Sequence, residues 1–323
     1  MSDTALTPER RDVVIRHSTV DRVFRGFVSV NALVSLVILA LISGFLLYRG
    51  FEVFRDFGLS FITTEKWEML DPADPSTATF GIAAMLVGSV VCSLIAVVFA
   101  VPFAIATALF IEYYAPKSVK PFLTGVLDFV AAIPSVIYGV WGYAVLLPVV
   151  TGWSVFLERN LDFLPFIDVP ELMFGRSPFM AGLLLALMIL PIVTSVAREV
   201  YSQAPRDLID ATYALGGTRW GAIRTVIMPF GRSGLVGGTM LGLGRALGET
   251  VAVYLTLNLV FDINLKILFS AGGNVASMIA TKFGEASPYE LKGLMAAGLV
   301  LFMVTLLVNL LATAVVNRSR KIA

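Results

Sequence analysis

Six long apolar stretches alternate with polar segments along this chain of 323 residues. They lie at about residues 27–48, 80–110, 125–150, 179–197, 235–260 and 294–316. An α-helix needs roughly 20 apolar residues to cross the hydrocarbon core of a bilayer, and each stretch approaches or exceeds that length. The pattern therefore predicts an all-α, polytopic membrane protein with six transmembrane helices. Its transmembrane domain covers 27–317, between a polar N-terminal arm, 1–26, and a short tail, 318–323.

The composition agrees with this class. The chain is 57% hydrophobic and 15% charged, whereas a soluble domain carries about 25% charged residues. One cysteine, Cys92, and one histidine, His17, supply neither a disulfide framework nor the ligands of a metal site. The chain has no phosphate loop of the form G-x-x-x-x-G-K-S/T and no HExxH motif. We therefore expect a protein that is not an enzyme and that binds no cofactor or metal itself.

The first apolar stretch has two interpretations. It follows five arginines, as the core of a signal peptide follows its basic segment. It is too long for such a core, however, and no small-residue cleavage site ends it. We interpret it as a retained first membrane helix.

Basic residues predict the orientation. With the N-terminus in the cytoplasm, 15 lysines and arginines fall on the cytoplasmic side and 8 on the opposite side. Cytoplasmic segments of membrane proteins carry such an excess. We therefore expect both termini, and the polar segment 198–232, in the cytoplasm.

Proline interrupts the third stretch at Pro134, which is followed by Ser135. A proline inside a membrane helix frees a backbone carbonyl, and this is tolerated where protein or a cavity satisfies it. Two interpretations stay open: a simple kink, or a discontinuous helix that lines a pathway.

Two short helices are predicted within 198–232. Pro205 suits a first helical turn, and Asp207 and Asp210 favour the positive end of the helix dipole. Gly216 and Gly217 end this helix, since glycine readily adopts the left-handed conformation that follows a C-terminus. Thr218 is then the predicted N-cap of a second helix, which Pro229 ends. The pair either packs against its own membrane helices or fits a groove on a partner.

The fifth stretch combines glycines with two charges. Glycines recur every four residues, at Gly234, Gly238 and Gly242, and such spacing lets another helix approach closely. Arg245 and Glu249 are one helical turn apart. Ionisable groups inside a span usually face the protein interior or a water-filled cavity. They are either a structural ion pair or a substrate element, in which Arg245 attracts an oxyanion and Glu249 holds the guanidinium in place.

The segment from Asp210 to Pro229 resembles the EAA signature of ABC-importer permeases. The spacing of the signature is reproduced here. Asp210-Ala211-Thr212 is followed after three residues by Gly216, and after nine more residues by the run from Val226 to Pro229. Asp210, Thr212, Val226 and Met228 depart from the usual residues. The resemblance implies that the first short helix is a coupling helix for a cytoplasmic ATPase. The implied coupling residues are Asp207, Asp210, Ala211, Thr212, Gly216 and Pro229.

Longer runs resemble the C-type permeases of the Pst inorganic phosphate importer. They are LGLGRALGETVAV, AAIPSVIYGVWGYAVLLP, FLTGVLDFVAAIPS and AVPFAIATALFIEYYAP. The resemblance implies the type I ABC-importer (MetI-like) fold in a prokaryotic inner or plasma membrane, and Arg245 and Glu249 in the substrate pathway. Pro134, Ser135, Gly238 and Gly242 would serve helix packing or gating. Implied partners are a homologous A-type permease, two ATPase subunits that bind ATP and Mg, an extracytoplasmic phosphate-binding protein, inorganic phosphate and the lipid bilayer, but no nucleic acid.

Two alternatives stay open. A permease for another oxyanion, such as sulfate or molybdate, would carry the same coupling segment. An ion-coupled transporter would work without ATPase subunits, but intramembrane acids beyond Asp128 and Glu249 are lacking, and the segment that resembles the EAA signature would be unexplained.

Overall fold

The computed structural model describes residues 18–167, 169 and 174–320, with side chains described as far as residue 314. The N-terminal arm up to residue 17 and the last three residues of the tail lie outside the described residues. The chain divides into two units, residues 1–48 and residues 49–323. The first unit holds most of helix α1 (Thr19–Phe57), and the second holds the other elements.

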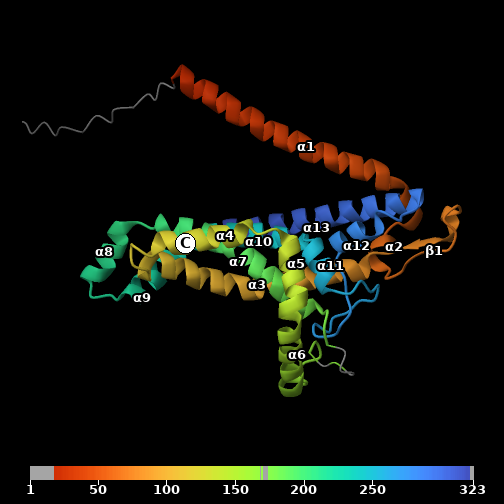
Figure 1. Ribbon diagram of the computed structural model, residues 1–323. Helices are drawn as coiled ribbons and strands as arrows, with labels where there is room; N and C mark the ends of the chain where they lie inside the picture. The colour runs from red at the N-terminus through yellow and green to blue at the C-terminus, as the bar shows by residue number, and fades with distance from the viewer. Residues whose placement is uncertain (1–17, 168, 170–173, 321–323) are drawn as a thin grey trace, which may run out of the picture. The chain divides into compact units, whose positions relative to one another are not determined.

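Helices make up most of the second unit (Figure 1). The α-helices after α1 are α2 (Ser60–Thr63), α3 (Ala83–Leu109), α4 (Lys120–Ala132), α5 (Ser135–Trp141), α6 (Leu147–Leu161), α7 (Pro178–Ser202), α8 (Arg206–Ala214), α9 (Arg219–Ala222), α10 (Met228–Leu247), α11 (Val251–Thr256), α12 (Val275–Lys282) and α13 (Pro288–Arg320). Three π-turns continue helices, at η2 (Phe110–Tyr114), η3 (Gly142–Leu146) and η4 (Ile223–Ile227). The described residues add one antiparallel hairpin, β1 (Trp67–Met69) with β2 (Ala78–Phe80), joined through the 3-10 turn η1 (Pro75–Thr77). The all-α prediction is confirmed.

Five helices among the described residues are long and apolar enough to cross a membrane. They run over Thr19–Phe57, Ala83–Tyr114, Ser135–Leu161, Pro178–Ser202 and Pro288–Ala314. They match five of the six predicted spans, and the second continues through Pro102. The prediction of one continuous fifth helix over 235–260 is wrong, because α10 ends at Leu247 and α11 begins at Val251.

The third predicted span is also discontinuous. Helix α4 ends at Ala132, and Ile133 adopts an extended ψ of 127° in front of Pro134. Proline disfavours the helical conformation in the residue before it, so the helix stops there. Of the two interpretations, the structure has the discontinuous helix, and its second part runs through η3 and α6 to Leu161, beyond the predicted end at residue 150. In Figure 1, α5 and α6 run across the direction of α3, α7 and α13.

Small residues on α3 hold the centre of the unit together. Ala96, Ala100, Ala104 and Ala108 recur every four residues, and all are buried. They form one stripe along the helix, because residues four apart lie on the same face. Ala96 and Ala100 belong to a buried cluster with apolar residues of α7, including Leu184, Leu185 and Ile189. Small side chains let the two helix backbones approach closely, and this pair forms the core of the fold.

The polar segment between the first two apolar stretches, residues 49–78, contains regular structure. Helix α1 continues to Phe57, and the hairpin places Trp67 against Phe80 with ring centroids 4.6 Å apart. Phe61 is fully buried beside them. Aromatic residues scattered among the acids therefore close one end of the helical body.

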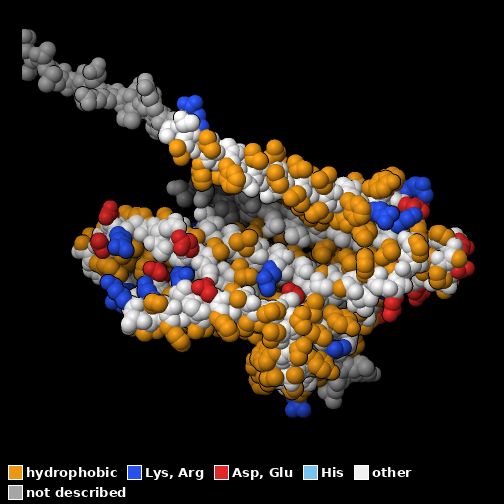
Figure 2. Space-filling model, turned by 45° about the horizontal axis from the view of Figure 1, so that its top comes forward, with side chains coloured by type: hydrophobic (Ala, Val, Ile, Leu, Met, Phe, Trp, Pro, Cys, Tyr) orange, Lys and Arg blue, Asp and Glu red, His pale blue; other side chains and the backbone are white. Residues whose placement is uncertain are grey.

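Helix α6 carries apolar side chains on its outer surface. Trp153 and Phe156 are exposed, and Figure 2 shows hydrophobic side chains covering the part of the unit that α6 forms. An exposed apolar surface of this kind suits contact with lipid or with another membrane helix.

Candidate functional site

The predicted coupling segment forms at one end of the helical body. Figure 1 shows α8 and α9 there, with β1 and α12 at the opposite end. The segment begins later than predicted, because α7 continues through Arg198 to Ser202. Arg198 donates to the Thr124 hydroxyl on α4, so it fastens one helix to another.

Helix α8 ends as the sequence predicts. Gly216 has φ +82°, a conformation that residues with a side chain rarely adopt. Its N–H donates to the Tyr213 carbonyl at 2.9 Å, and the Gly217 N–H donates to the Thr212 carbonyl at 2.9 Å. These two bonds form a Schellman motif, which satisfies carbonyls that the helix end would leave unpaired. The chain therefore reverses sharply between α8 and α9.

The second short helix differs from its prediction at one end. The Thr218 hydroxyl accepts from the Gly221 N–H at 3.1 Å, so Thr218 is the N-cap as predicted. Pro229 does not end the helix, because the chain runs through η4 directly into α10. Proline lacks the N–H that an α-helix needs inside, and the wider π-turn just before it accommodates this loss. The short helix is thus continuous with the membrane helix.

The outer faces of α8 and α9 expose large apolar residues. Leu208 is 56% exposed, Trp220 is 58% exposed, and Leu215 at the turn is 90% exposed. The inner side of the segment is buried. Ile223 and Ile227 of η4 lie in a cluster with Tyr201 of α7. The segment therefore packs on its own membrane helices through η4 and Ile209, and the remaining face of α8 is exposed among the described residues.

The coupling residues implied by the resemblance lie on or beside α8. Asp207, Asp210, Ala211 and Gly216 are exposed, and Thr212 is partly buried with its hydroxyl donating to the Leu208 carbonyl at 2.9 Å. Pro229 is exposed at the start of α10.

Glycines of α10 meet valines of α7. A Cβ added at Gly238 would lie 3.0 Å from Val196 Cβ, and one at Gly242 would lie 2.9 Å from Val193 Cγ2. Gly234 faces Val200 in the same way. The close helix approach predicted from this spacing is present, and it fixes α10 against α7.

Arg245 and Glu249 flank the break between α10 and α11. Arg245 lies in the last turn of α10 and is exposed, whereas Glu249 follows the helix end and is 8% exposed. No ion pair joins them in the part of the chain that the structure describes, so the expected pairing is not observed. Residues four apart face each other only while a helix continues, and α10 stops at Leu247.

Glu249 instead supports the start of α11. Its Oε1 accepts from the Ala252 N–H at 3.4 Å, and its backbone carbonyl accepts from Asn274 Nδ2 at 2.6 Å. A carboxylate at a helix N-terminus is stabilised by the helix dipole and by the unpaired N–H groups there. The carboxylate and the amide therefore satisfy backbone groups that the break exposes.

Asn274 and Ser89 are residues that sequence reasoning missed. Asn274 is 1% exposed and caps α12, its Oδ1 accepting from the Ser277 N–H at 2.8 Å. The Ser89 hydroxyl accepts from the Val275 N–H at 3.1 Å, which ties this cap to α3. Their signal in the sequence is weak, because a polar residue in a loop and a serine in an apolar helix are both common.

Helices α5 and α11 lie together beyond the two breaks. A Cβ at Gly139 would lie 3.1 Å from Ala252 Cα, and one at Gly142 would lie 3.4 Å from Thr256 Cγ2. Gly139 thus faces Ala252, and the later Gly142 faces the later Thr256, so the two helices run parallel. At the two breaks, Pro134 and Arg245 are exposed and Ser135 is half-buried.

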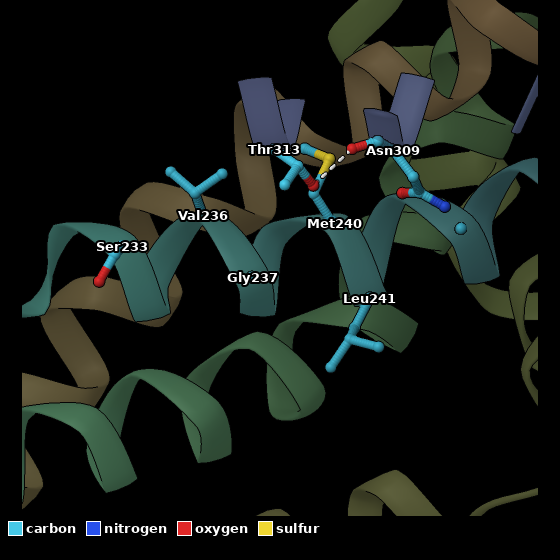
Figure 3. Close-up of a pocket in the computed structure, with 8 residues that line it drawn as sticks. Ser233, Val236, Gly237, Met240, Leu241, Asn309 and Thr313 are labelled. Atoms are coloured by element: carbon cyan, nitrogen blue, oxygen red, sulfur yellow. Dashed lines mark hydrogen bonds between the residues drawn. The ribbon is translucent and has the colours of Figure 1, made fainter. Parts of the chain in front are cut away.

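A groove lies on the face of α10 that α7 leaves free. It has a volume of ≈ 420 Å³, and Figure 3 shows Gly237, Met240 and Leu241 along α10 with Asn309 and Thr313 of α13 above them. The Thr313 hydroxyl donates to the Asn309 carbonyl at 2.8 Å. Within the described residues no group of three His, Cys, Asp or Glu side chains forms a metal site.

The helix arrangement agrees with the matching family. Residues 100–321 match the family described as the binding-protein-dependent transport system inner membrane component. The chain belongs to this family. It is therefore a multi-pass membrane permease subunit of the ABC-importer type.

Similar inner membrane components occur in bacteria and archaea. The phosphate transport system permease protein PstC 2 of Mycobacterium tuberculosis is 38% identical over 298 residues, which is 91% of each chain. The PstC of Haemophilus influenzae is 36% identical over 94% of this chain and 95% of its own. The probable PstC of Methanocaldococcus jannaschii is 35% identical over 89% and 91%.

Solved structures show the same fold at low identity. The MetNI methionine ABC transporter in an inward-facing conformation matches with a TM-score of 0.50 and 17% identity, over 74% of this chain and 94% of that chain. A bacterial ABC transporter involved in the import of the acidic polysaccharide alginate matches with a TM-score of 0.51 and 16% identity, over 92% and 99%. The inner membrane component therefore has the MetI-like permease fold.

Proposed function

We propose that this chain is the permease subunit of an ATP-driven importer of inorganic phosphate and forms half of its translocation pathway. The observation that carries the substrate is Arg245 at the break between α10 and α11, with no carboxylate paired to it among the described residues. An arginine is always charged, and its planar fork of donors matches an oxyanion. The names of the relatives, phosphate transport system permease proteins, support the same substrate.

The proposed pathway runs past the two helix breaks. Discontinuous membrane helices place backbone ends and charged groups where a substrate crosses the middle of the bilayer. Glu249 acts there as a positioning residue, because it caps α11 and so holds the break that presents Arg245. Pro134 and Ser135 at the α4–α5 break, and Gly238 and Gly242 between α10 and α7, would allow the helices to shift as the pathway opens.

Coupling to ATP hydrolysis would pass through α8. Its exposed Leu208 and Leu215, with Trp220 of α9, present an apolar surface that no described residue of this chain covers. A cytoplasmic ATPase subunit with an apolar groove would fit it. Closure of two such subunits on ATP and Mg would push α8, and the continuous path α9–η4–α10 would carry the push to Arg245. This chain would then have no catalytic role of its own.

The remaining partners follow from the same proposal. A homologous A-type permease would form the second half of the pathway, and an extracytoplasmic binding protein would deliver phosphate at the end that carries β1 and α12. Both termini and α8 would face the cytoplasm, which agrees with Arg206, Arg219 and Arg224 near α8 and α9.

Uptake by the assembled complex in proteoliposomes tests the function. We expect ATP-dependent phosphate uptake that sulfate and molybdate do not compete away. Uptake of another oxyanion in preference to phosphate would show that phosphate is not the substrate. Uptake by this chain alone, without ATPase subunits, would show ion-coupled transport instead of ATP-driven import.

The variant Arg245→Ala tests the site in the same assay. Loss of a charge-assisted contact predicts a decrease in phosphate uptake of about tenfold or more. Arg245→Lys keeps the charge and should retain part of the rate. Co-purification of all subunits is the control for assembly, and wild-type uptake by an assembled Arg245→Ala complex would exclude the proposed role.

A further inference from the structure

A second arginine, Arg176, contacts the segments that follow α5 and α11. Arg176 stands just before Ser177, the N-cap of α7. Its guanidinium carbon lies 4.9 Å from the centroid of the Tyr143 ring in η3. Its Nη1 donates to Asn258 Oδ1, after the end of α11, at 3.4 Å. Arg176 thus contacts a residue just after the end of α11, the helix that begins six residues after Arg245.

One nitrogen of this guanidinium is unpaired among the described residues. Nε is buried and has no hydrogen-bond partner within the described residues. No carboxylate lies within ion-pair distance of Arg176 in that part of the chain either. Nε and Nη2 form the side-on edge of the guanidinium, the edge that receives an oxyanion in a bidentate contact. Because Asn258 occupies Nη1, this edge is the one that remains for a ligand.

The neighbouring groups fix the orientation of the guanidinium. Asn258 Nδ2 donates to the Ser270 hydroxyl at 3.1 Å and to the Ser270 carbonyl at 3.3 Å, which directs its Oδ1 toward Arg176. The Ser270 hydroxyl also donates to the Arg176 carbonyl at 3.5 Å. Tyr143 and the segment from Asn258 to Ser270 therefore hold this cation, and no acid among the described residues pairs with it, although burying an uncompensated charge costs free energy.

The two arginines lie at opposite ends of α11. Arg245 is six residues before Val251, where α11 begins, and Arg176 bonds Asn258, two residues after Thr256, where α11 ends. The helix between them rises by about 9 Å. Gly139 and Gly142 also pack on α11. An anion that left one cation would meet the other within a short step.

We propose that Arg176 is an outer oxyanion site of the translocation pathway, which receives inorganic phosphate through its Nε–Nη2 edge before Arg245 does. The proposal rests on the proposed function. A purely structural arginine, holding the segment before α7 against Tyr143 and Asn258, is the alternative that the experiment must separate.

The experiment measures phosphate uptake by the complete importer in proteoliposomes. We expect Arg176→Gln to lower uptake by about tenfold, the size expected for one charge-assisted contact. Arg176→Lys should retain most of the rate, because it keeps the charge. The matched control is Arg159→Gln, which removes an exposed arginine at the end of α6. Wild-type uptake by Arg176→Gln would overturn the proposal.

Chemical restoration of the charge separates a substrate site from a structural role. Cys92, the single cysteine, is 1% exposed, so wild-type complex treated with the same reagents serves as the background. In Arg176→Cys, aminoethyl methanethiosulfonate adds a positive charge to the assembled complex and should raise uptake. Sulfonatoethyl methanethiosulfonate adds a negative charge and should not. Equal effects of the two reagents would overturn the proposal.

Phosphate uptake by the wild-type complex tells a failure of this inference from a failure of the function on which it rests. If the wild-type importer took up no phosphate, the proposed function would fail. If the wild type took up phosphate and both Arg176→Gln and the charged reagents left the rate unchanged, only the outer site would fail.

Discussion

Single residues at helix ends decide where the helices of this permease start and stop. Gly216 reverses the chain after α8 with φ +82°, and Glu249 caps α11 after the break. Neither position contributes much buried apolar surface. Each satisfies backbone groups that a helix end leaves unpaired, and so each decides where a rigid segment starts or stops.

The variant Gly216→Val tests the turn between α8 and α9. A β-branched residue in the left-handed conformation is strained by about 1 to 2 kcal/mol, so α8 should lose its fixed orientation. We expect weaker stimulation of ATP hydrolysis by the loaded binding protein, with less phosphate carried for each ATP hydrolysed. Gly221→Ala is the matched control, because its Cβ would make an ordinary 3.5 Å contact with the Thr218 hydroxyl. Unchanged stimulation in Gly216→Val would count against the hinge.

At the scale of elements, two interrupted helices create the candidate site. Helix α4 stops before Pro134 and α10 stops at Leu247, and the helices that follow, α5 and α11, pack in parallel. The second break is held from outside by the segment Gly273-Asn274, which bonds the Glu249 carbonyl. That segment in turn rests on α3, where Gly88 has no side chain to displace it.

The variant Gly88→Ala tests this support. Its Cβ would lie 1.9 Å from the Gly273 carbonyl oxygen, so the Asn274 segment must move. Overpacking of this kind costs about 1 to 3 kcal/mol. We expect a lower thermal midpoint of the solubilised complex and slower uptake. Gly237→Ala adds the same methyl group on α10 with nothing within 4 Å, and it should behave like the wild type. An unaffected Gly88→Ala complex would contradict the supporting role.

At the scale of the whole molecule, the segment proposed to couple to an ATPase and the segment proposed to receive phosphate lie at opposite ends of the helical body (Figure 1). Helices α8 and α9 lie at one end of the helical body, and the β1–β2 hairpin and α12 lie at the other (Figure 1). The path α9–η4–α10 connects the coupling end to Arg245. Such continuity suits a subunit that converts a push on one side of the membrane into a change near its middle.

Labelling from the two sides of the membrane tests the orientation. Leu215, 90% exposed beside α8, and Leu70, 83% exposed beside β1, mark the two ends. Because Cys92 is buried, single cysteines at these positions report without strong background. We expect a membrane-impermeant thiol reagent to label Leu70→Cys in intact cells and Leu215→Cys only in inverted vesicles. The reverse labelling pattern would show that the chain has the opposite orientation in the membrane.

Hydropathy and spacing alone predicted much of this protein. Stretches of apolar residues located five of the helices, since the length of a membrane span follows from bilayer thickness. Glycine and threonine at 216–218 predicted the turn between α8 and α9, because its chemistry is local. The glycine spacing on α10 also predicted a close helix approach for the same local reason.

Tertiary structure alone decided the breaks and what surrounds them. Nothing local indicates that Glu249 caps α11 while Asn274, 25 residues later, bonds its carbonyl. Arg245 and Glu249 form no ion pair among the described residues, because the helix that would bring them together stops at Leu247. Pro229 continues a helix because a π-turn absorbs its missing donor, and that turn is held by packing on α7. Arg176 meets Tyr143 and Asn258 only through folding, since three segments distant in sequence must converge to bring these side chains together.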